Sequence, residues 1–423
     1  MSEEFVRLNT IVAGGGICGL SSAIALRRAG HNVTIYERHG ADSDAGAGIV
    51  LGANATRVLS QWGLDLASVG ALRHSEGLVI DGKTLRVLAR EPAPVGHANT
   101  TRHDLRLLLT REVERIPDLD RGEGTIKVVY EQRVTDYDAT RPAVQLADGI
   151  WVEADLVVAC DGIRSKAAKI ILGKNIPAIA TGYSAFRLVI DTEKFDAVRE
   201  KFPDSKLVQT RLDNSVPEVP VWFAVENPGR IFVWWTCRFG QVSAMDIIMP
   251  DNDKYAGSEE WLARCDKQVL IDEYGHWHPV FTEIVKAAED PLLYKICARD
   301  PVEILHKGSL CILGDALHPM APYRGQGGSQ SIEDAGALEM CLTGIYDRAE
   351  VPRRLELLQK LRVPRYATVQ LASSVRQDEP NVEARFAEIL KISQKWFEGS
   401  GISARMIHLL CLVIPWLIMF YSA

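Results

Sequence analysis

The chain has 423 residues and a mass of 46.8 kDa. This length exceeds that of domains built around a single hydrophobic core, so we expect two or more domains. Apolar residues make up 47% and charged residues 24%, which excludes a disordered chain, a collagen and a small disulfide-stapled protein. Lys and Arg total 48 against 55 Asp and Glu, so the net charge is −7. Because such a chain lacks a broad basic surface, we expect no nucleic-acid partner.

The start of the chain and the cysteines indicate the compartment. The opening MSEEFVRLNT has no basic segment followed by an apolar one, so we expect no secretory signal and a cytoplasmic protein. The eight cysteines are scattered, with no C-x-x-C pair and no metal-ligand spacing. We therefore expect free thiols in a reducing compartment and no metal site.

The first elements read as strand, glycine turn, helix and strand. Leu8 to Ala13 is a short apolar run, residues 20–29 have a helical pattern, and Asn32 to Tyr36 forms a second strand. This order is a βαβ unit, whose two strands are normally parallel and whose connection is right-handed.

Within this unit, Gly14, Gly16 and Gly19 match the dinucleotide fingerprint G-x-G-x-x-G. Gly14 allows the tight turn, Gly16 lets the backbone approach a pyrophosphate, and Gly19 lets the helix pack closely on the strand. The helix N-terminus adds N–H donors and a positive dipole. Glu37, at the end of the second strand, can accept hydrogen bonds from a ribose 2′-hydroxyl and would repel a 2′-phosphate. The pattern predicts bound FAD or NAD.

The middle of the chain is rich in strand formers and the end is helical. Asp81-Gly82 and Asp148-Gly149 lie between β-rich runs and predict hairpins, and the segment from about Lys206 to Ile248 predicts an antiparallel sheet. From about Ser331 the pattern is helical. We predict the α/β class: a Rossmann-like nucleotide-binding domain with an inserted β-rich (α+β) domain and a helical C-terminal region.

Two further motifs distinguish FAD from NAD as the bound dinucleotide. One is ADLVVACDGIRSKAAK, a buried strand that ends in Asp161-Gly162; the other is CILGDALHPMAPYRGQGGSQSIEDAG, a strand that ends in Gly314-Asp315 and leads to a helix. Together with the fingerprint and the run Arg102-His103-Asp104-Leu105, they follow one order along residues 8–345. In this order the sequence resembles the single-component (class A) FAD-dependent aromatic hydroxylases of the salicylate-hydroxylase type.

The resemblance implies that the cofactor is FAD. Asp315 would accept hydrogen bonds from the ribityl chain, Arg102 would contact the phosphate or ribityl region, and the glycine loop after Asp315 would lie close to the flavin ring. A solvated surface arginine is the alternative for Arg102. Gly48 and Asn54, in GAGIVLGANATRVL, match a family segment that would pass beside the flavin; the alternatives are a turn glycine and a helix N-cap. The complete expected set of cofactor-binding residues is Gly14, Gly16, Gly19, Glu37, Gly48, Arg102, Asp161, Asp315, Gly325, Gly327 and Gly328.

The sequence departs from the family pattern at three positions. Ala168 stands where the Asp-Gly motif usually has arginine, Leu317 where the Gly-Asp motif usually has alanine, and Arg324 places a cation in a loop that is more often apolar. The first departure concerns a motif implicated in NAD(P)H binding, and the chain has no second glycine fingerprint. The choice between NADPH and NADH as co-substrate therefore stays open.

The resemblance also implies a division into domains. Residues 1–75, 98–172 and 285–345 would form a discontinuous FAD-binding domain, residues 76–97 and 173–284 the substrate domain with its β-sheet, and residues 346–423 the C-terminal helical region.

The reaction that the resemblance implies is performed largely by the cofactor. NAD(P)H would reduce FAD, oxygen would add to give a flavin C4a-hydroperoxide, and one oxygen atom would pass to an electron-rich aromatic carbon. Arg187, in GYSAFRLVID, is the expected catalytic residue, because an arginine there can stabilise a phenolate; an exposed salt-bridge partner is the alternative. Trp235 and Arg238, in WWTCRFG, resemble a family Tyr-Pro-x-Arg segment near the substrate. Trp235 replaces the tyrosine, and we expect it to be the second catalytic residue beside Arg187.

Three neighbouring residues are expected to be structural. We predict Trp222 and Trp234 as core residues and His318 as a residue that orders its loop. The sequence has no G-x-S-x-G, H-E-x-x-H or Walker A motif, which argues against a hydrolase, a zinc protease and an NTPase.

Two other functions stay open. The same flavin chemistry could epoxidise an olefin or an indole double bond, which needs no phenolate, or the chain could be a non-catalytic flavin-binding protein. The expected partners are a small aromatic or fused-ring substrate and O2, and the chain would be a monomer or a homodimer. The apolar tail from Met406 to Tyr421 is interrupted by His408 and Pro415, so we expect a packed helix, with membrane association as the alternative.

Overall fold

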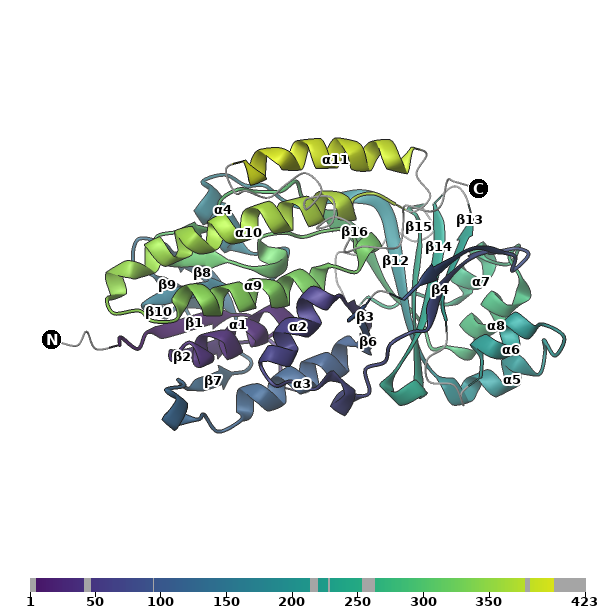
Figure 1. The fold of residues 1–423 in the computed structure, drawn as a ribbon, viewed down its shortest axis with the longest axis horizontal. Helices are drawn as coiled ribbons and strands as arrows, with labels where there is room; N and C mark the ends of the chain where they lie inside the picture. Colours follow the sequence, from purple (N-terminus) through teal and green to yellow (C-terminus); the bar gives the residue numbers. More distant parts are fainter. Residues whose placement is uncertain are drawn as a thin grey trace.

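The computed structural model describes residues 5–41, 47–93, 95–213, 220–226, 229–252, 263–376 and 381–398. Figure 1 shows a six-stranded sheet with its helices at one end of the molecule and a seven-stranded sheet with smaller helices at the other. The expected tail segment 406–421 lies outside the described residues. Within the described ranges, no helix is both long and apolar enough to cross a membrane.

The six-stranded sheet has the order β17-β18-β11-β1-β2-β7. Its central strands are continuous apolar runs, as expected for parallel strands covered on both faces. β1 is parallel to β2 and to β11, so the predicted βαβ unit is confirmed. The strands are β1 (Asn9–Ala13), β2 (Asn32–Tyr36), β7 (Ile126–Val129), β11 (Leu156–Ala159), β17 (His306–Lys307) and β18 (Leu310–Ile312).

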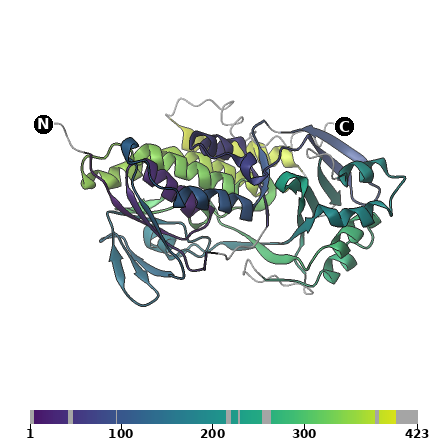
Figure 2. The same cartoon turned by 90° about the horizontal axis from the view of Figure 1, so that it is seen from below.

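Helices and a small sheet cover these strands. α1 packs against α9 and α3, and α9 packs against α2 and α10. Figure 2 shows the three-stranded sheet β10-β9-β8 on the other side of the molecule from α9 and α10. These elements are α1 (Ile17–Arg28), α2 (Ala53–Gln61), α3 (Arg102–Glu114), α4 (Lys166–Leu172), α9 (Gly327–Leu342), β8 (Val134–Asp138), β9 (Ala143–Leu146) and β10 (Trp151–Glu153).

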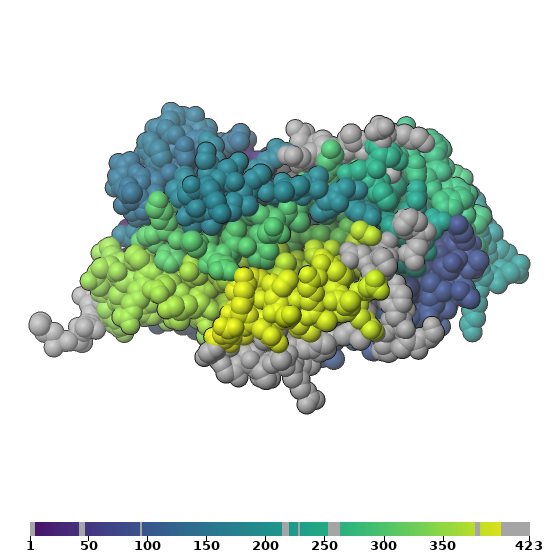
Figure 3. Space-filling view, turned by 90° about the horizontal axis from the view of Figure 1, so that it is seen from above, coloured from purple at the N-terminus to yellow at the C-terminus, as the bar shows by residue number. Residues whose placement is uncertain are grey.

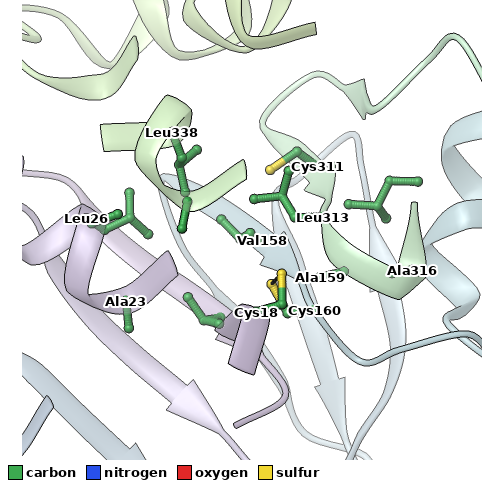
Figure 4. Close-up of a cluster of buried hydrophobic side chains, with 14 of the residues drawn as sticks. Cys18, Ala23, Leu26, Val158, Ala159, Cys160, Cys311, Leu313, Ala316 and Leu338 are labelled. Carbon is green, nitrogen blue, oxygen red and sulfur yellow. Dashed lines mark hydrogen bonds between the residues drawn. The ribbon is translucent and has the colours of Figure 1, made fainter. Parts of the chain in front are cut away.

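The core under α1 and α9 is built from small and branched side chains. Leu26 of α1, Leu338 of α9 and Val158 of β11 pack together in it (Figure 4). Cys18 and Cys160 lie side by side there with their sulfurs 3.3 Å apart, and the seven described cysteines are all free, as expected.

The seven-stranded sheet has the order β16-β12-β15-β14-β13-β4-β5. The hairpin β4–β5 and the hairpin β9–β10 confirm the two Asp-Gly turns, and β13, β14 and β15 are antiparallel as predicted. The strands are β4 (Glu76–Asp81), β5 (Val87–Pro92), β12 (Ile179–Asp191), β13 (Val221–Glu226), β14 (Arg230–Cys237), β15 (Val242–Pro250) and β16 (Leu292–Ala298).

The alternation of side chains divides this sheet into two faces. On one face Trp222 and Trp234 are almost completely buried in a core with the small helices, which confirms the prediction for both residues. On the other face Trp235 and Ala244 pack against β3, the strand that carries Gly48. The helices on the first face are α5 (Asp196–Arg199), α6 (Lys206–Arg211), α7 (Gln268–Glu273) and α8 (Pro279–Ala287).

Two short strands and two long helices complete the fold. β3 (Gly48–Leu51) pairs with β6 (Ala98–Thr101), and β3 contacts β12 and β15 of the large sheet. α10 (Val351–Ser373) packs on α9, and α11 (Val382–Phe397) packs on α10 and lies along the outer surface seen in Figure 3. The helical pattern predicted from about Ser331 is therefore confirmed for α9, α10 and α11.

Two details differ from the sequence analysis. The antiparallel sheet does not begin at Lys206, because Lys206 starts α6, whose first turn is capped by the Ser205 hydroxyl that accepts from the Val208 N–H at 3.4 Å. The expected boundary at residue 285 falls inside α8 and assigns β16 to the FAD-binding domain, although β16 is hydrogen-bonded to β12. A division by sheet membership, with the boundary after β16, is the one we propose.

Candidate active site

The glycine turn after β1 has the geometry that a pyrophosphate needs. Gly14 has φ +100°, and a Cβ there would lie 2.7 Å from the Cys160 carbonyl oxygen. A Cβ on Gly19 would lie 1.8 Å from the Gly14 oxygen, so α1 can pack on the turn only with glycine at this position. Gly16 is the N-cap of α1 without a side-chain cap, and a Cβ there would meet nothing within 4 Å. The N-terminus of α1 therefore opens to space where an anion can approach.

Glu37 lies against this turn. Its Oε2 accepts a hydrogen bond from the Gly15 N–H at 2.5 Å and its Oε1 accepts from the His39 N–H at 2.8 Å. The carboxylate is thus held beside the glycine turn at the end of β2, and its contact with a ribose stays a prediction.

The Asp-Gly motif joins the same turn from the neighbouring strand. Asp161 follows β11, and its Cα lies 3.2 Å from the position of a Cβ on Gly14. Its Oδ2 accepts a hydrogen bond from the Tyr137 hydroxyl at 2.6 Å, and its buried Oδ1 has no hydrogen-bond partner in the described part of the chain. Burial raises the pKa of Asp161. An orphaned carboxylate oxygen beside the turn is the feature expected where a cofactor hydroxyl or amine donates.

Asp315 is surrounded by charged residues from several segments of the chain. It lies just after β18, and burial raises its pKa, while the charges of His318, Arg102, Arg187 and Arg299 oppose this rise. Arg102 begins α3 and Arg187 lies on β12, so the fold gathers three predicted site residues from separate segments. His318 is completely buried with its Nε2 2.7 Å from Asp334 Oδ2, which agrees with a role in ordering the loop.

The loop that follows Asp315 lies against β3. Gly325 has φ +61°, Gly327 begins α9 without a side-chain cap, and a Cβ on Gly328 would lie 2.6 Å from Ile49. The Asn54 amide donates to Glu333 at 2.7 Å. Asn54 lies inside α2, whose N-cap is Gly52, so the N-cap alternative for Asn54 is wrong.

Gly48 has a packing reason for its lack of a side chain. A Cβ on Gly48 would lie 2.4 Å from the Ala244 Cβ and 2.5 Å from Trp235 Cζ2. β3 can therefore lie directly on the large sheet only with glycine at this position. A contact between Gly48 and the cofactor stays a prediction.

Arg187 is held on the face of the large sheet that Trp235 also occupies. Its Nε lies 3.2 Å from Asp246 Oδ1, and its guanidinium carbon lies 4.5 Å from the centre of the Tyr294 ring. Burial lowers the pKa of Arg187, but Tyr294, Asp246 and Asp315 raise it above its ordinary value. Arg187 is thus a permanent cation. Of the alternative for it, the salt bridge is present, with Asp246, but the strand face is not exposed there, because the Arg187 side chain is 17% exposed.

Two residues of this cluster were missed by sequence reasoning. Asp246 stands in the apolar run SAMDIIMP, and a lone carboxylate in such a strand was a usable signal. Tyr294 carried no signal, because β16 comes to β12 only through sheet pairing at Tyr294↔Ala185. Arg238 is bonded to Asp104 of α3, with Nη2–Oδ1 at 2.9 Å, and its expected position near the substrate stays a prediction.

Fold and site together define the class: a flavoprotein with a glycine-turn cofactor domain and a second sheet that carries the partly buried Arg187 cation. In agreement, the model of the family described as FAD binding domain matches residues 7–256. The chain belongs to this family. It is an FAD-dependent monooxygenase, and its cofactor is FAD.

Individual relatives cover most of the chain. The FAD-dependent monooxygenase cfoG of Aspergillus candidus is 29% identical over 88% of this chain and 86% of the relative. The 6-hydroxynicotinate 3-monooxygenase of Pseudomonas fluorescens is 27% identical over 78% of this chain and 81% of its own length, and hispidin-3-hydroxylase of Neonothopanus nambi is 26% identical over 90% of each chain. These relatives remove the non-catalytic alternative.

Solved structures share the fold. CtdE in complex with FAD and a substrate has a TM-score of 0.74 at 20% identity, covering 92% of this chain and 99% of CtdE. The salicylate hydroxylase substrate complex has a TM-score of 0.71 at 22% identity, covering 95% of this chain and 98% of the hydroxylase. The predicted fold class, with its helical C-terminal region, is confirmed.

Proposed function

We propose that this enzyme inserts one oxygen atom from O2 into an electron-rich carbon of a small aromatic or fused-ring substrate, with NAD(P)H as the reductant. The observation that carries the proposal is the placement of Arg187 between Asp246 and Tyr294, on the sheet face whose charges act on Asp315. A relative named as a hydroxylase of hispidin and another named as a monooxygenase of 6-hydroxynicotinate support it.

The chain's own residues would prepare the substrate. A phenol is hydroxylated more readily as its anion, and a buried arginine stabilises that anion through a charge-assisted hydrogen bond. Asp246 and the Tyr294 ring fix the direction of the Arg187 guanidinium, so little reorganisation is needed when the anion forms. The apolar side chains of Trp235 and Val233 on the same face would keep water from the reacting ring. When bound, FAD supplies the oxidation–reduction chemistry that activates O2.

The expected cofactor contacts form part of this proposal. The pyrophosphate would bind at Gly14, Gly16 and Gly19, with the ribose at Glu37. The part of FAD between this ribose and the flavin ring would bind to Asp161, Arg102 and Asp315. The flavin ring itself would lie beside Gly48 and the loop that contains Gly325, Gly327 and Gly328. We keep both NADPH and NADH as possible reductants.

A second candidate is epoxidation of an olefin or an indole double bond. The observation that favours it is Trp235, which occupies the position of the family's tyrosine and brings no hydroxyl for proton transfer. Epoxidation forms no phenolate, so it does not require the Arg187 cation.

Oxygen-isotope labelling tests the proposal and separates the two reactions. Purified FAD-loaded enzyme is given NADPH or NADH, 18O2 and a panel of phenols, hydroxy-naphthalenes, indoles and styrenes, and products are analysed by mass spectrometry. Hydroxylation predicts that phenols stimulate NAD(P)H oxidation and gain one 18O on the ring. Labelled product that forms from styrenes or indoles but not from phenols supports epoxidation. Stimulated oxidation without a labelled product from any compound would refute both reactions.

A further inference from the structure

Glu91 lies on the same face of the large sheet as Trp235, although no motif pointed to it. In the strand pairing, Glu91 of β5 is opposite Gly77 of β4, and Gly77 is opposite Val221 of β13. Val221 belongs to the same buried cluster as Trp235. Directly paired side chains point to one face of a sheet, so Glu91 faces the same side as Trp235. At about 4.8 Å per strand, the two residues are roughly 14 Å apart across the sheet.

The Glu91 carboxylate is buried without a hydrogen bond. The residue is 4% exposed, and neither carboxylate oxygen has a hydrogen-bond partner in the described ranges. Burial raises the pKa of Glu91 to about 7, a rise that the charge of Arg324 partly opposes. A buried carboxylate without donors destabilises the folded protein, so its presence needs a reason other than stability.

Arg324 connects this carboxylate to the flavin loop. It lies in the short helix Pro322–Arg324 that precedes Gly325, and its guanidinium lies 5.2 Å from the centre of the Phe386 ring of α11. Arg324 is also the cation that departs from the family's more apolar loop. The charge of Arg324 acts on Glu91, so the two residues link the edge strand β5 of the large sheet electrostatically to the loop that contains Gly325.

We propose that Glu91 is a substrate-binding residue that accepts a hydrogen bond from an O–H or N–H group at the end of the substrate remote from the oxygenated carbon. This inference rests on the proposed function and narrows its substrate class. The substrate would be a molecule of linked or fused rings that reaches from Trp235 toward β5 and carries a hydrogen-bond donor at its far end. Single-ring phenols would lack this contact and bind more weakly.

Two biphenyl probes test the contact without turnover. 4,4′-Dihydroxybiphenyl has a remote donor and 4-hydroxybiphenyl lacks it, and binding is followed by the change in the flavin absorption of oxidised enzyme without NAD(P)H. We expect the native enzyme to bind the dihydroxy probe about tenfold more tightly at a pH above 7, where the Glu91 carboxylate is ionised, as for a hydrogen bond to a charged group. Glu91→Gln should reduce this preference to less than about threefold. Equal affinities in the native enzyme, or no binding of either probe, would overturn the proposal.

Control variants separate binding from folding. Glu76→Gln lies on the same hairpin, where Glu76 pairs with Arg90 at 2.6 Å, and it should keep the full preference. Without probe, Glu91→Gln should retain FAD and melt at or above the native temperature, because it replaces a buried carboxylate that makes no hydrogen bond in the described ranges. A lower melting temperature with an unchanged probe preference would assign Glu91 a structural role and refute the proposal. Glu91→Asp, which keeps the carboxylate on a shorter stem, should give an intermediate preference.

The outcome is distinguishable from a failure of the proposed function. If 4,4′-dihydroxybiphenyl binds through Glu91 and stimulates NAD(P)H oxidation but gains no 18O, the contact stands and hydroxylation fails. If labelled product forms and Glu91→Gln does not change the probe preference, hydroxylation stands and the contact fails.

Discussion

Arg238 and Asp104 form a bidentate ion pair between segments 134 residues apart, with Nη2–Oδ1 at 2.9 Å and Nε–Oδ2 at 3.1 Å. Asp104 also accepts from the Thr101 hydroxyl at 2.6 Å, and its N–H donates to that hydroxyl at 3.0 Å, in the first turn of α3. The pair therefore ties the end of β14 to the turn that carries Arg102. It couples the position of the substrate sheet to that of a predicted cofactor residue.

A double-mutant cycle on Arg238 and Asp104 should show this coupling. Arg238→Ala and Asp104→Asn should each lower the free energy of unfolding by about 1–2 kcal/mol, with an interaction energy of roughly 1 kcal/mol because Arg238 is partly exposed. Urea unfolding of the native protein, both single variants and the double variant measures these values. Strictly additive effects would show that the two side chains do not stabilise each other.

Arg187→Ala should uncouple oxidation from oxygen transfer. Loss of the cation that we propose stabilises a substrate anion should lower product formed per NAD(P)H consumed by about tenfold to a hundredfold, while bound FAD is kept. The measurement is product yield against NAD(P)H consumed, with Arg90→Ala as the control at an exposed ion pair. A coupling ratio equal to that of the native enzyme would remove Arg187 from the mechanism.

Gly16→Ala and Gly19→Ala should fail in different ways. A Cβ on Gly16 meets no protein atom within 4 Å, so the apoprotein should keep its melting temperature but retain less FAD. A Cβ on Gly19 overlaps the Gly14 oxygen, so Gly19→Ala should destabilise the apoprotein by several kcal/mol, as overpacking against backbone does. Flavin absorption after gel filtration and thermal unfolding of the apoproteins measure the two effects. Full FAD retention by Gly16→Ala would contradict the pyrophosphate assignment.

Asp334 should give the protein acid-sensitive stability. It is completely buried and bonded to Arg362 Nε at 2.7 Å; burial would raise its pKa, but His318 and Arg362 lower it to about 2. Because the folded-state pKa lies below the unfolded value of about 3.9, this stabilisation is present above about pH 5 and is lost as the pH falls toward 2.

The matching variant is Asp334→Asn. It should be about 3–5 kcal/mol less stable than the native protein at pH 7, and the difference should shrink between about pH 4 and pH 2. Urea unfolding at several pH values provides the comparison, with the exposed Asp120→Asn as a control that should show little difference. A stability difference that is constant with pH would contradict the role of the ionised carboxylate.

The sequence alone predicted the parts of the site that are local. The turn Gly14–Gly19 with Glu37, the Asp-Gly motif and the Gly-Asp motif each depend on backbone geometry within a few residues of a strand end, and such geometry is encoded by short patterns. The same local rules predicted the parallel βαβ unit and the two hairpins, and the strand pairing confirms them.

Only the tertiary structure decided which side chains meet on the large sheet. Arg187 was visible in the sequence, but its neighbours Asp246 and Tyr294 come from strands 59 and 107 residues further on, and Glu91 comes from an edge strand almost 100 residues earlier. Strand order and register set these contacts, and a shift of one residue would turn each side chain to the opposite face. The sequence therefore determined the cofactor, while the order of seven strands decided which charged side chains share one face of the large sheet.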